Sequence, residues 1–134
     1  MLPSLTEFNV LLTKMKKTTL VLGASLNPVR YSNIAIKRLT DNNIKTVAVG
    51  LKKGKVGNVT IETDKKEFLD IDTVTLYLNP TRQVEYYDYI ISLKPRRVIF
   101  NPGTENAEFM AVLKEHKIES EIACTLVLLS TGQY

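Results

Sequence analysis

The sequence contains little of what several functional classes require: its 134 residues include one cysteine, one histidine and no tryptophan. The single cysteine, Cys124, cannot form a disulfide within the chain, which excludes a disulfide-stapled domain. The single histidine, His116, excludes a histidine-rich metal site, and no acidic cluster has the spacing of metal ligands. His116 also lies near the end of a predicted helix, a position typical of solvated histidines, so we expect no catalytic role for it.

Long apolar runs are missing as well. No run approaches the roughly 20 residues that cross a bilayer, so we expect no contact with membranes. Residues 1–14, "MLPSLTEFNVLLTK", lack the basic leader and long apolar core of a signal peptide. A cytoplasmic location is therefore the default expectation.

The composition is that of a soluble globular domain, with 44% hydrophobic and 24% charged residues. Eighteen basic residues against 14 acidic ones give a net charge of +4. Nucleic-acid-binding domains usually concentrate such charge on one face with interleaved aromatics, a pattern absent here, so we expect no nucleic-acid partner. The basic residues are either a solvated surface or, in part, contacts for an anionic ligand.

Short apolar runs alternate with helical patterns along the whole chain, which predicts βαβ units and a parallel sheet. The result would be an α/β fold with about five strands in a doubly wound sheet, covered by helices on both faces. The predicted strands are 18–23, 45–50, 72–80, 96–103 and 118–124. The predicted helices are 30–43, one or two turns in 64–71, 81–93 with Thr81 as N-cap, 104–117 with Thr104 as N-cap, and a short helix or tail in 125–134.

The predicted strands end in residues suited to ligand contact rather than in ordinary hydrophobics. In doubly wound sheets ligands bind beyond the carboxyl ends of the strands, where the strand order switches. The four ends read Gly23-Ala24-Ser25, Gly50-Leu51-Lys52-Lys53, Tyr77-Leu78-Asn79-Pro80 and Asn101-Pro102-Gly103-Thr104. Any one of them could be a simple turn, but all four would open onto one edge of the sheet.

The first strand end, in "VLGASLNPVRYSNIAIKRL", favours phosphate binding but not a standard NAD site. The dinucleotide fingerprint needs three glycines, and only the first, Gly23, is present. Ala24 and Ser25 are small enough to let a phosphate approach the backbone, and the following helix directs its positive end towards an anion. Arg30 can donate two hydrogen bonds to phosphate oxygens.

The second strand end narrows the choice of ligand. An NAD site places Asp or Glu there for the ribose hydroxyls, whereas this chain has Lys52 and Lys53. Lysines suit an extra phosphate on the adenosine ribose, which NADP carries at the 2′ and coenzyme A at the 3′ position. The alternative is that both lysines are solvated loop residues.

Five segments together resemble a known family: "GASLNPVRYSNIAIKRL", "VAVGLKKGKVGNVTI", "LDIDTVTLYLNP", "VIFNPGTENAEF" and "IACTLVLL". In this order and spacing they are similar to the small bacterial CoA-binding domain proteins, which themselves resemble the CoA-binding domain of the succinyl-CoA synthetase α subunit. The resemblance covers about residues 16–128. It implies a Rossmann-like, three-layer αβα domain over residues 15–134 that binds coenzyme A across the switch point, with residues 1–14 as an N-terminal extension.

The resemblance also implies which residues bind coenzyme A. Gly23, Ala24, Ser25 and Arg30 would form a phosphate loop, with Asn27 and Tyr31 in the same stretch; Lys52 and Lys53 would face the 3′-phosphate; Tyr77, Asn79 and Pro80 would line the groove for the adenine or pantetheine; Asn101, Gly103, Glu105 and Cys124 would lie near the thiol. The chain departs from the usual family pattern at the second, third and fourth strand ends. These departures concern the pantetheine contacts more than the phosphate loop.

No set of nucleophile, base and orienting residue is visible, so a ligand-binding or regulatory module is favoured over an enzyme. Two alternatives stay open: a small NADP-dependent oxidoreductase, and a protein-interaction domain whose nucleotide site has decayed. Cys124 is either a small core residue or a thiol near the ligand. Residues 1–14 are either a helix packed on the outside or a mis-assigned start ahead of Met15. The protein partner and the acyl group, if any, are not indicated.

Overall fold

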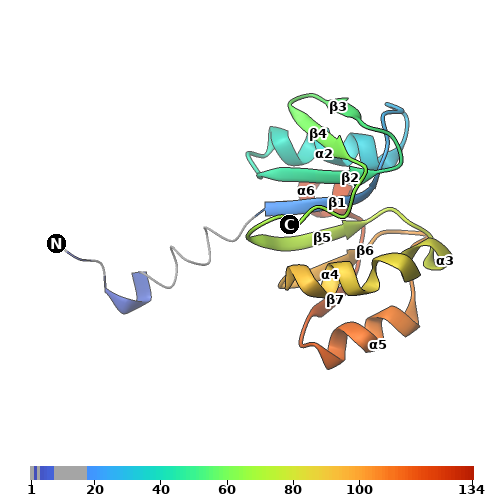
Figure 1. Cartoon of the computed structure of the whole chain (residues 1–134). Helices are drawn as coiled ribbons and strands as arrows, with labels where there is room; N and C mark the ends of the chain where they lie inside the picture. The colour runs from blue at the N-terminus through green and yellow to red at the C-terminus, as the bar shows by residue number, and fades with distance from the viewer. Residues whose placement is uncertain (1, 3, 8–17) are drawn as a thin grey trace.

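The structure is a computed structural model that describes residues 2, 4–7 and 18–134. The described part contains one seven-stranded sheet in the order β3-β4-β2-β1-β5-β6-β7 (Figure 1). Its strands are β1 (Thr18–Ala24), β2 (Thr46–Gly50), β3 (Gly54–Val56), β4 (Val59–Glu62), β5 (Ile71–Leu76), β6 (Arg97–Phe100) and β7 (Glu119–Ile122). Every neighbouring pair is parallel except β3 and β4. The predicted doubly wound α/β fold is confirmed.

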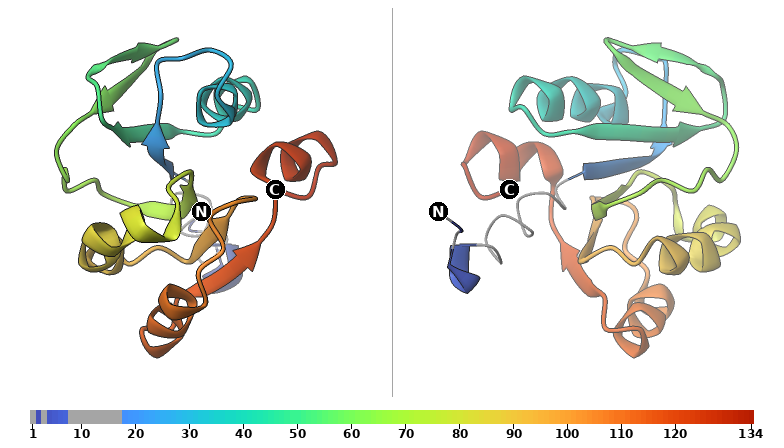
Figure 2. Two further views of the ribbon diagram at one scale, coloured as in Figure 1. Left: turned by 90° about the vertical axis from the view of Figure 1, so that its right-hand side faces the viewer. Right: turned by 60° about the vertical axis from the view of Figure 1, so that its left-hand side comes forward.

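Helices cover both faces of the sheet, as the apolar strands require (Figure 2). They are α2 (Tyr31–Asp41), α3 (Pro80–Gln83), the 3-10 helix η1 (Val84–Tyr86), α4 (Tyr87–Leu93), α5 (Ala107–Glu115) and α6 (Thr125–Ser130). Figure 2 shows α2 and α6 on one side of the sheet and α4 and α5 on the other. Among the described residues, no helix has the length and apolar character to cross a bilayer.

The larger core lies between the sheet and α4 and α5. Phe100 from β6 and Phe109 from α5 are fully buried and meet edge to face, with ring centroids 6.0 Å apart. The ring of Tyr87 stacks on Phe109 at 4.1 Å. Because parallel strands present apolar side chains to both faces, α2 packs a second cluster on the other side, around Ile36 and Leu39.

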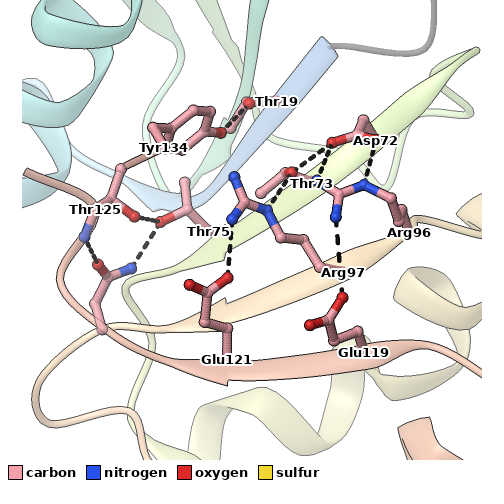
Figure 3. Close-up of polar contacts among 11 residues, drawn as sticks. Thr19, Asp72, Thr73, Thr75, Arg96, Arg97, Glu119, Glu121, Thr125 and Tyr134 are labelled. Carbon is pink, nitrogen blue, oxygen red and sulfur yellow. Dashed lines mark hydrogen bonds and ion pairs between the residues drawn. The ribbon is translucent and has the colours of Figure 1, made fainter. Parts of the chain in front are cut away.

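Part of that second face is polar where it lies over β5, β6 and β7. Thr19, Thr73 and Arg97 stand in one row across neighbouring strands. Arg97 donates from Nε to Thr73 Oγ1 at 3.0 Å and from Nη1 to Glu121 Oε2 at 2.8 Å (Figure 3). The ring of Tyr134 lies against the Arg97 guanidinium, with 4.6 Å between the guanidinium carbon and the ring centroid. The Tyr134 hydroxyl is hydrogen-bonded to Thr19.

Two predictions about elements were wrong. The strand number was underestimated because no strand was predicted between residues 51 and 71, where the structure has β3 and, directly after it, its hairpin partner β4. Strands of three and four residues are too short for a clear alternating pattern. Segment 64–71 is not helical. Its backbone hydrogen bonds run from Lys66 N to Asp64 O and from Phe68 N to Lys66 O, and each closes a turn of three residues.

Both predicted threonine N-caps were also wrong. Asn79 caps α3 through Oδ1, which accepts from Arg82 N at 2.9 Å, and Pro80 occupies the first helical position that suits proline. Asn106 caps α5 by accepting from Phe109 N at 3.1 Å. Thr104 instead donates its hydroxyl to Asn101 O and closes the preceding turn. Segment 81–93 is three successive short helices (α3, η1, α4) rather than one.

The predicted boundary between residues 1–14 and the domain, with the alternative start at Met15, lies largely outside the described residues.

Candidate functional site: a cleft at the carboxyl ends of the strands

The switch point of the sheet lies between β1 and β5. β1 is hydrogen-bonded to β2 on one edge and to β5 on the other, so the chain reverses its direction of progress across the sheet there. A cleft of about 750 Å³ opens at the carboxyl ends of these strands. Its size is that of a site for a cofactor or drug-sized ligand.

Glycines let the strand ends come close together beneath this cleft. A Cβ on Gly50, at the end of β2, would lie 2.2 Å from Ala24 O, a distance that no side chain can adopt. Gly23 has a φ of +93°, and its Cβ would lie 2.9 Å from the backbone of Tyr77. A larger residue at either position would push the first strand end away from its neighbours.

The loop between β1 and α2 is shaped by its own side chains. Ser25 Oγ accepts from Asn27 N at 3.1 Å, and Asn27 Oδ1 accepts from Val29 N at 3.1 Å. Asn33, in the first turn of α2, donates from Nδ2 to Ser25 O at 2.9 Å. Because Ser25 Oγ acts here as an acceptor, its hydroxyl hydrogen is left to donate to a ligand.

The N-terminus of α2 faces the cleft without a capping side chain. Arg30 occupies the N-cap position with an extended backbone (ψ 142°) and makes no side-chain cap, and the first turn contains no acidic residue. The first backbone N–H groups of a helix have no partner within it, and the helix dipole places partial positive charge at this end. An anion can take the place of the missing cap.

The charged side chains along the cleft are all basic. Arg30, Lys52 and Arg82 line it, and no Asp, Glu, His or Cys is among the described residues of the lining. Within the described part of the chain, no ion pair joins any of the three to a carboxylate. The cleft therefore attracts anions and offers no general base or thiol nucleophile on its walls.

Most of the residues predicted to bind a ligand line this one cleft: Gly23, Ala24, Ser25, Asn27, Arg30, Tyr31, Lys52, Tyr77, Asn79 and Gly103. Burial raises the pKa of Tyr77 to about 12, so its phenol stays protonated near neutral pH.

The other predicted residues lie outside the cleft lining. Asn101 is buried beneath it, where its amide donates to Thr75 Oγ1 and Leu76 O and accepts from Thr125 N. Glu105 is exposed and accepts from Gly103 N at 2.5 Å. Lys53 is exposed in the loop after β2. Pro80 is the first residue of α3, and Cys124 is half-buried directly before α6.

Sequence reasoning missed two kinds of cleft residue. Arg82 and Tyr86 reach the cleft from α3 and η1. Both lie in the segment that was predicted as one helix starting at Thr81. The Asn79-Pro80 pair was the signal that the helix begins earlier. The second kind is an exposed apolar rim, formed by Leu26, Val29 and Leu51.

Comparisons with known proteins show the family of the chain. Residues 17–130 match the family described as "CoA binding domain". The chain belongs to this CoA binding domain family. No curated protein matches the chain.

Solved structures with the same fold include relatives at two levels of similarity. One, described as an uncharacterized protein, is 49% identical, with a TM-score of 0.86 over 88% of this chain and 98% of the other. A hypothetical protein from Pyrococcus horikoshii OT3 is 26% identical, with a TM-score of 0.74 over 96% and 92%. A Thermus thermophilus protein, 21% identical with a TM-score of 0.77 over 96% and 98%, shares the fold.

Proposed function

We propose that the chain binds coenzyme A, or an acyl-CoA, in the cleft as a ligand-binding or regulatory module. The observation that carries the proposal is the combination of an uncapped α2 N-terminus with three basic side chains and no acidic one. Coenzyme A presents a diphosphate and a 3′-phosphate, which are the groups that such a surface attracts. Membership of the CoA binding domain family supports the same ligand.

The arrangement of the cleft suggests how the ligand would lie. Its diphosphate would meet the N–H groups at the start of α2, the Ser25 hydroxyl and Arg30. Its 3′-phosphate would meet Lys52, which follows β2 on one side of β1. The pantetheine arm would then run to the other side of β1, towards Arg82 and Gly103.

NADP is the second candidate, because Lys52 suits a ribose 2′-phosphate as well as a 3′-phosphate. The cleft lining offers no acidic or imidazole group for proton transfer beside a nicotinamide. A protein-interaction domain with a decayed site is the third, and it predicts that no nucleotide stabilises the fold.

The test is thermal unfolding of the protein with coenzyme A, dephospho-CoA, NADP and NAD at equal concentrations. A ligand at 100 times its Kd stabilises the folded state by about 2.7 kcal/mol, enough for a clear shift in Tm. We expect the largest shift with coenzyme A. A larger shift with NADP would replace the proposal by a reductase, and no shift with any nucleotide would overturn both.

Two neighbouring lysines provide a matched pair for the 3′-phosphate. Lys52 lines the cleft and Lys53 does not, although both are exposed in the same loop. Lys52→Ala should weaken coenzyme A binding about tenfold, the size of a charge-assisted contact, with little change for dephospho-CoA. Lys53→Ala should leave both affinities as they are. Equal effects of the two substitutions in calorimetric titrations would contradict this placement of the phosphate.

A further inference from the structure

One buried side chain joins two walls of the cleft. Gln83, at the end of α3, is fully buried and donates both hydrogens of its amide to backbone carbonyls. Nε2 lies 2.7 Å from Leu78 O and 2.8 Å from Thr104 O. Leu78 follows β5 and Thr104 follows β6, and both residues line the cleft.

The oxygen of the same amide, Oε1, is hydrogen-bonded as well. Asn106 donates from Nδ2 to Gln83 Oε1 at 2.9 Å and to the Tyr87 hydroxyl at 2.8 Å. Its own Oδ1 caps α5 through Phe109 N. The loops after β5 and β6, the end of α3 and the start of α5 are therefore fixed to one another through Gln83.

This network serves only one half of the cleft. We call "arm half" the part lined by Leu78, Asn79, Gly103 and Thr104, from the loops after β5 and β6, and by Arg82 from α3. The "nucleotide half" is lined by residues from the loops after β1 and β2, among them Arg30 and Lys52. The side chain of Gln83 makes its hydrogen bonds with Leu78, Thr104 and Asn106, and with no described residue of the nucleotide half.

The chemistry of glutamine fits this position. An amide is planar, with two donors and an acceptor in fixed directions, so it can set the separation of two carbonyls and fix the orientation of a third group. Removing it would take this donor away from the buried carbonyls of Leu78 and Thr104 and one acceptor away from the Asn106 amide, which would still be bonded to Tyr87 and Phe109. The two loops would then be free to separate.

We propose that Gln83 is a positioning residue that fixes the arm half of the cleft, and so the binding of the pantetheine arm. The proposal rests on the proposed function, since it takes coenzyme A as the ligand. Gln83 is buried and does not line the cleft, so it acts through Leu78 and Thr104.

The test compares two ligands on three proteins. Adenosine 3′,5′-bisphosphate carries the 3′-phosphate and one 5′-phosphate but neither the second 5′-phosphate nor the pantetheine, and coenzyme A carries all of these groups. Gln83→Met keeps the length of the side chain and removes its hydrogen bonds. Leu113→Ala, in the core between α5 and the sheet, is the control for a general loss of stability. Kd values are measured by calorimetry at a temperature at which all three proteins are folded.

We expect Gln83→Met to change the Kd values of the two ligands by different factors. Gln83→Met should raise the Kd of coenzyme A about tenfold and that of adenosine 3′,5′-bisphosphate less than about twofold, because misplacement of a supporting group affects only what it supports. Leu113→Ala should change neither. Equal weakening of both ligands by Gln83→Met, or no weakening, would overturn the role of Gln83. Wild-type protein that binds neither ligand would instead overturn the proposed function, and this inference with it.

A measurement on the wild-type protein keeps the proposal testable if Gln83→Met does not fold. The side-chain amide hydrogens of Gln83 are buried and bonded, so they should give NMR signals that exchange slowly with water. Coenzyme A should shift these signals and adenosine 3′,5′-bisphosphate should not. Equal shifts with both ligands, or none with coenzyme A, would overturn the proposal.

Discussion

Three arginines of this chain occupy two contrasting environments. Arg97 is 7% exposed and is bonded to Thr73 and Glu121, with Tyr134 against its guanidinium (Figure 3). Arg30 and Arg82 are exposed along the cleft and have no ion-pair partner among the described residues. The same side chain thus supports the fold in one region and stays available in the other.

The physical reason for the difference is hydration. A charge removed from water is destabilising unless partners replace its hydration, and breaking a buried pair is strongly destabilising because one charge is left alone. An exposed cation that lines the cleft keeps its hydration shell until an anion binds. We therefore expect Arg97 to support the fold, and Arg30 and Arg82 to contact a ligand if one binds in the cleft.

The largest effect expected from this comparison is on stability. Arg97→Ala should lower the free energy of unfolding by about 3 kcal/mol, because Glu121 loses its cation and Thr73 a hydrogen bond. Urea unfolding measures this change. The Kd of coenzyme A for the folded variant should stay within about twofold of the wild type, since Arg97 does not line the cleft. A loss of stability below about 1 kcal/mol would remove the distinction between the two environments.

The opposite pattern is expected at the cleft. Arg30→Ala should raise the Kd of coenzyme A about tenfold through the loss of a charge-assisted contact. Its free energy of unfolding should change by less than about 0.5 kcal/mol, as is usual for an exposed side chain without partners. Arg38→Ala, on the last turn of the same helix and outside the cleft lining, is the matched control and should leave the Kd unchanged. If Arg30→Ala lost stability but bound coenzyme A as tightly as the wild type, Arg30 would be a structural residue and not a ligand contact.

The smallest effect concerns the aromatic ring beside Arg97. Burial raises the pKa of Tyr134 above its ordinary value of 10.0. The unfolded chain therefore ionises first, and the stabilisation that Tyr134 gives is complete below pH 10 and declines as pH rises above it. Tyr134→Phe removes this dependence and the hydrogen bond to Thr19, which is worth about 1 kcal/mol at neutral pH.

Urea unfolding of both proteins between pH 7 and about 11 checks this prediction. Wild type should lose stability above pH 10 more steeply than Tyr134→Phe. Some slope should remain in the variant, because burial also raises the pKa values of Tyr77 and Tyr89 to about 12. Parallel curves for the two proteins would show that Tyr134 does not contribute to the alkaline loss.

The sequence was sufficient for the architecture because the long strands are nearly continuous apolar runs, as strands covered on both faces must be. β1 and β5 are examples. Because these two strands are neighbours on either side of the switch point, the residues that follow them, such as Ser25 and Asn79, line the same cleft. The hairpin of β3 and β4 was missed because pairing with β2, rather than local propensity, holds such short strands in place.

The position of the candidate cleft was predictable from the sequence, and the arrangement of its side chains was less so. Asn101 follows a strand end as Gly103 does, but only the packed structure shows that its amide is occupied by Thr75, Leu76 and Thr125. Arg82 was missed because its place depends on where α3 begins. Gln83 is polar and lies within a helical pattern, so no local signal distinguishes it from a solvated residue.

The position of β1 in the middle of the sheet also affects how the chain acquires its structure. Among the described strands, only β3 and β4 pair as a hairpin, whereas Thr18 of β1 pairs with Ile71 of β5. Domains dominated by such distant pairings fold in roughly milliseconds to seconds, more slowly than helical bundles. During synthesis β1 leaves the ribosome well before β5, so one edge of the central strand stays open to other chains until β5 follows.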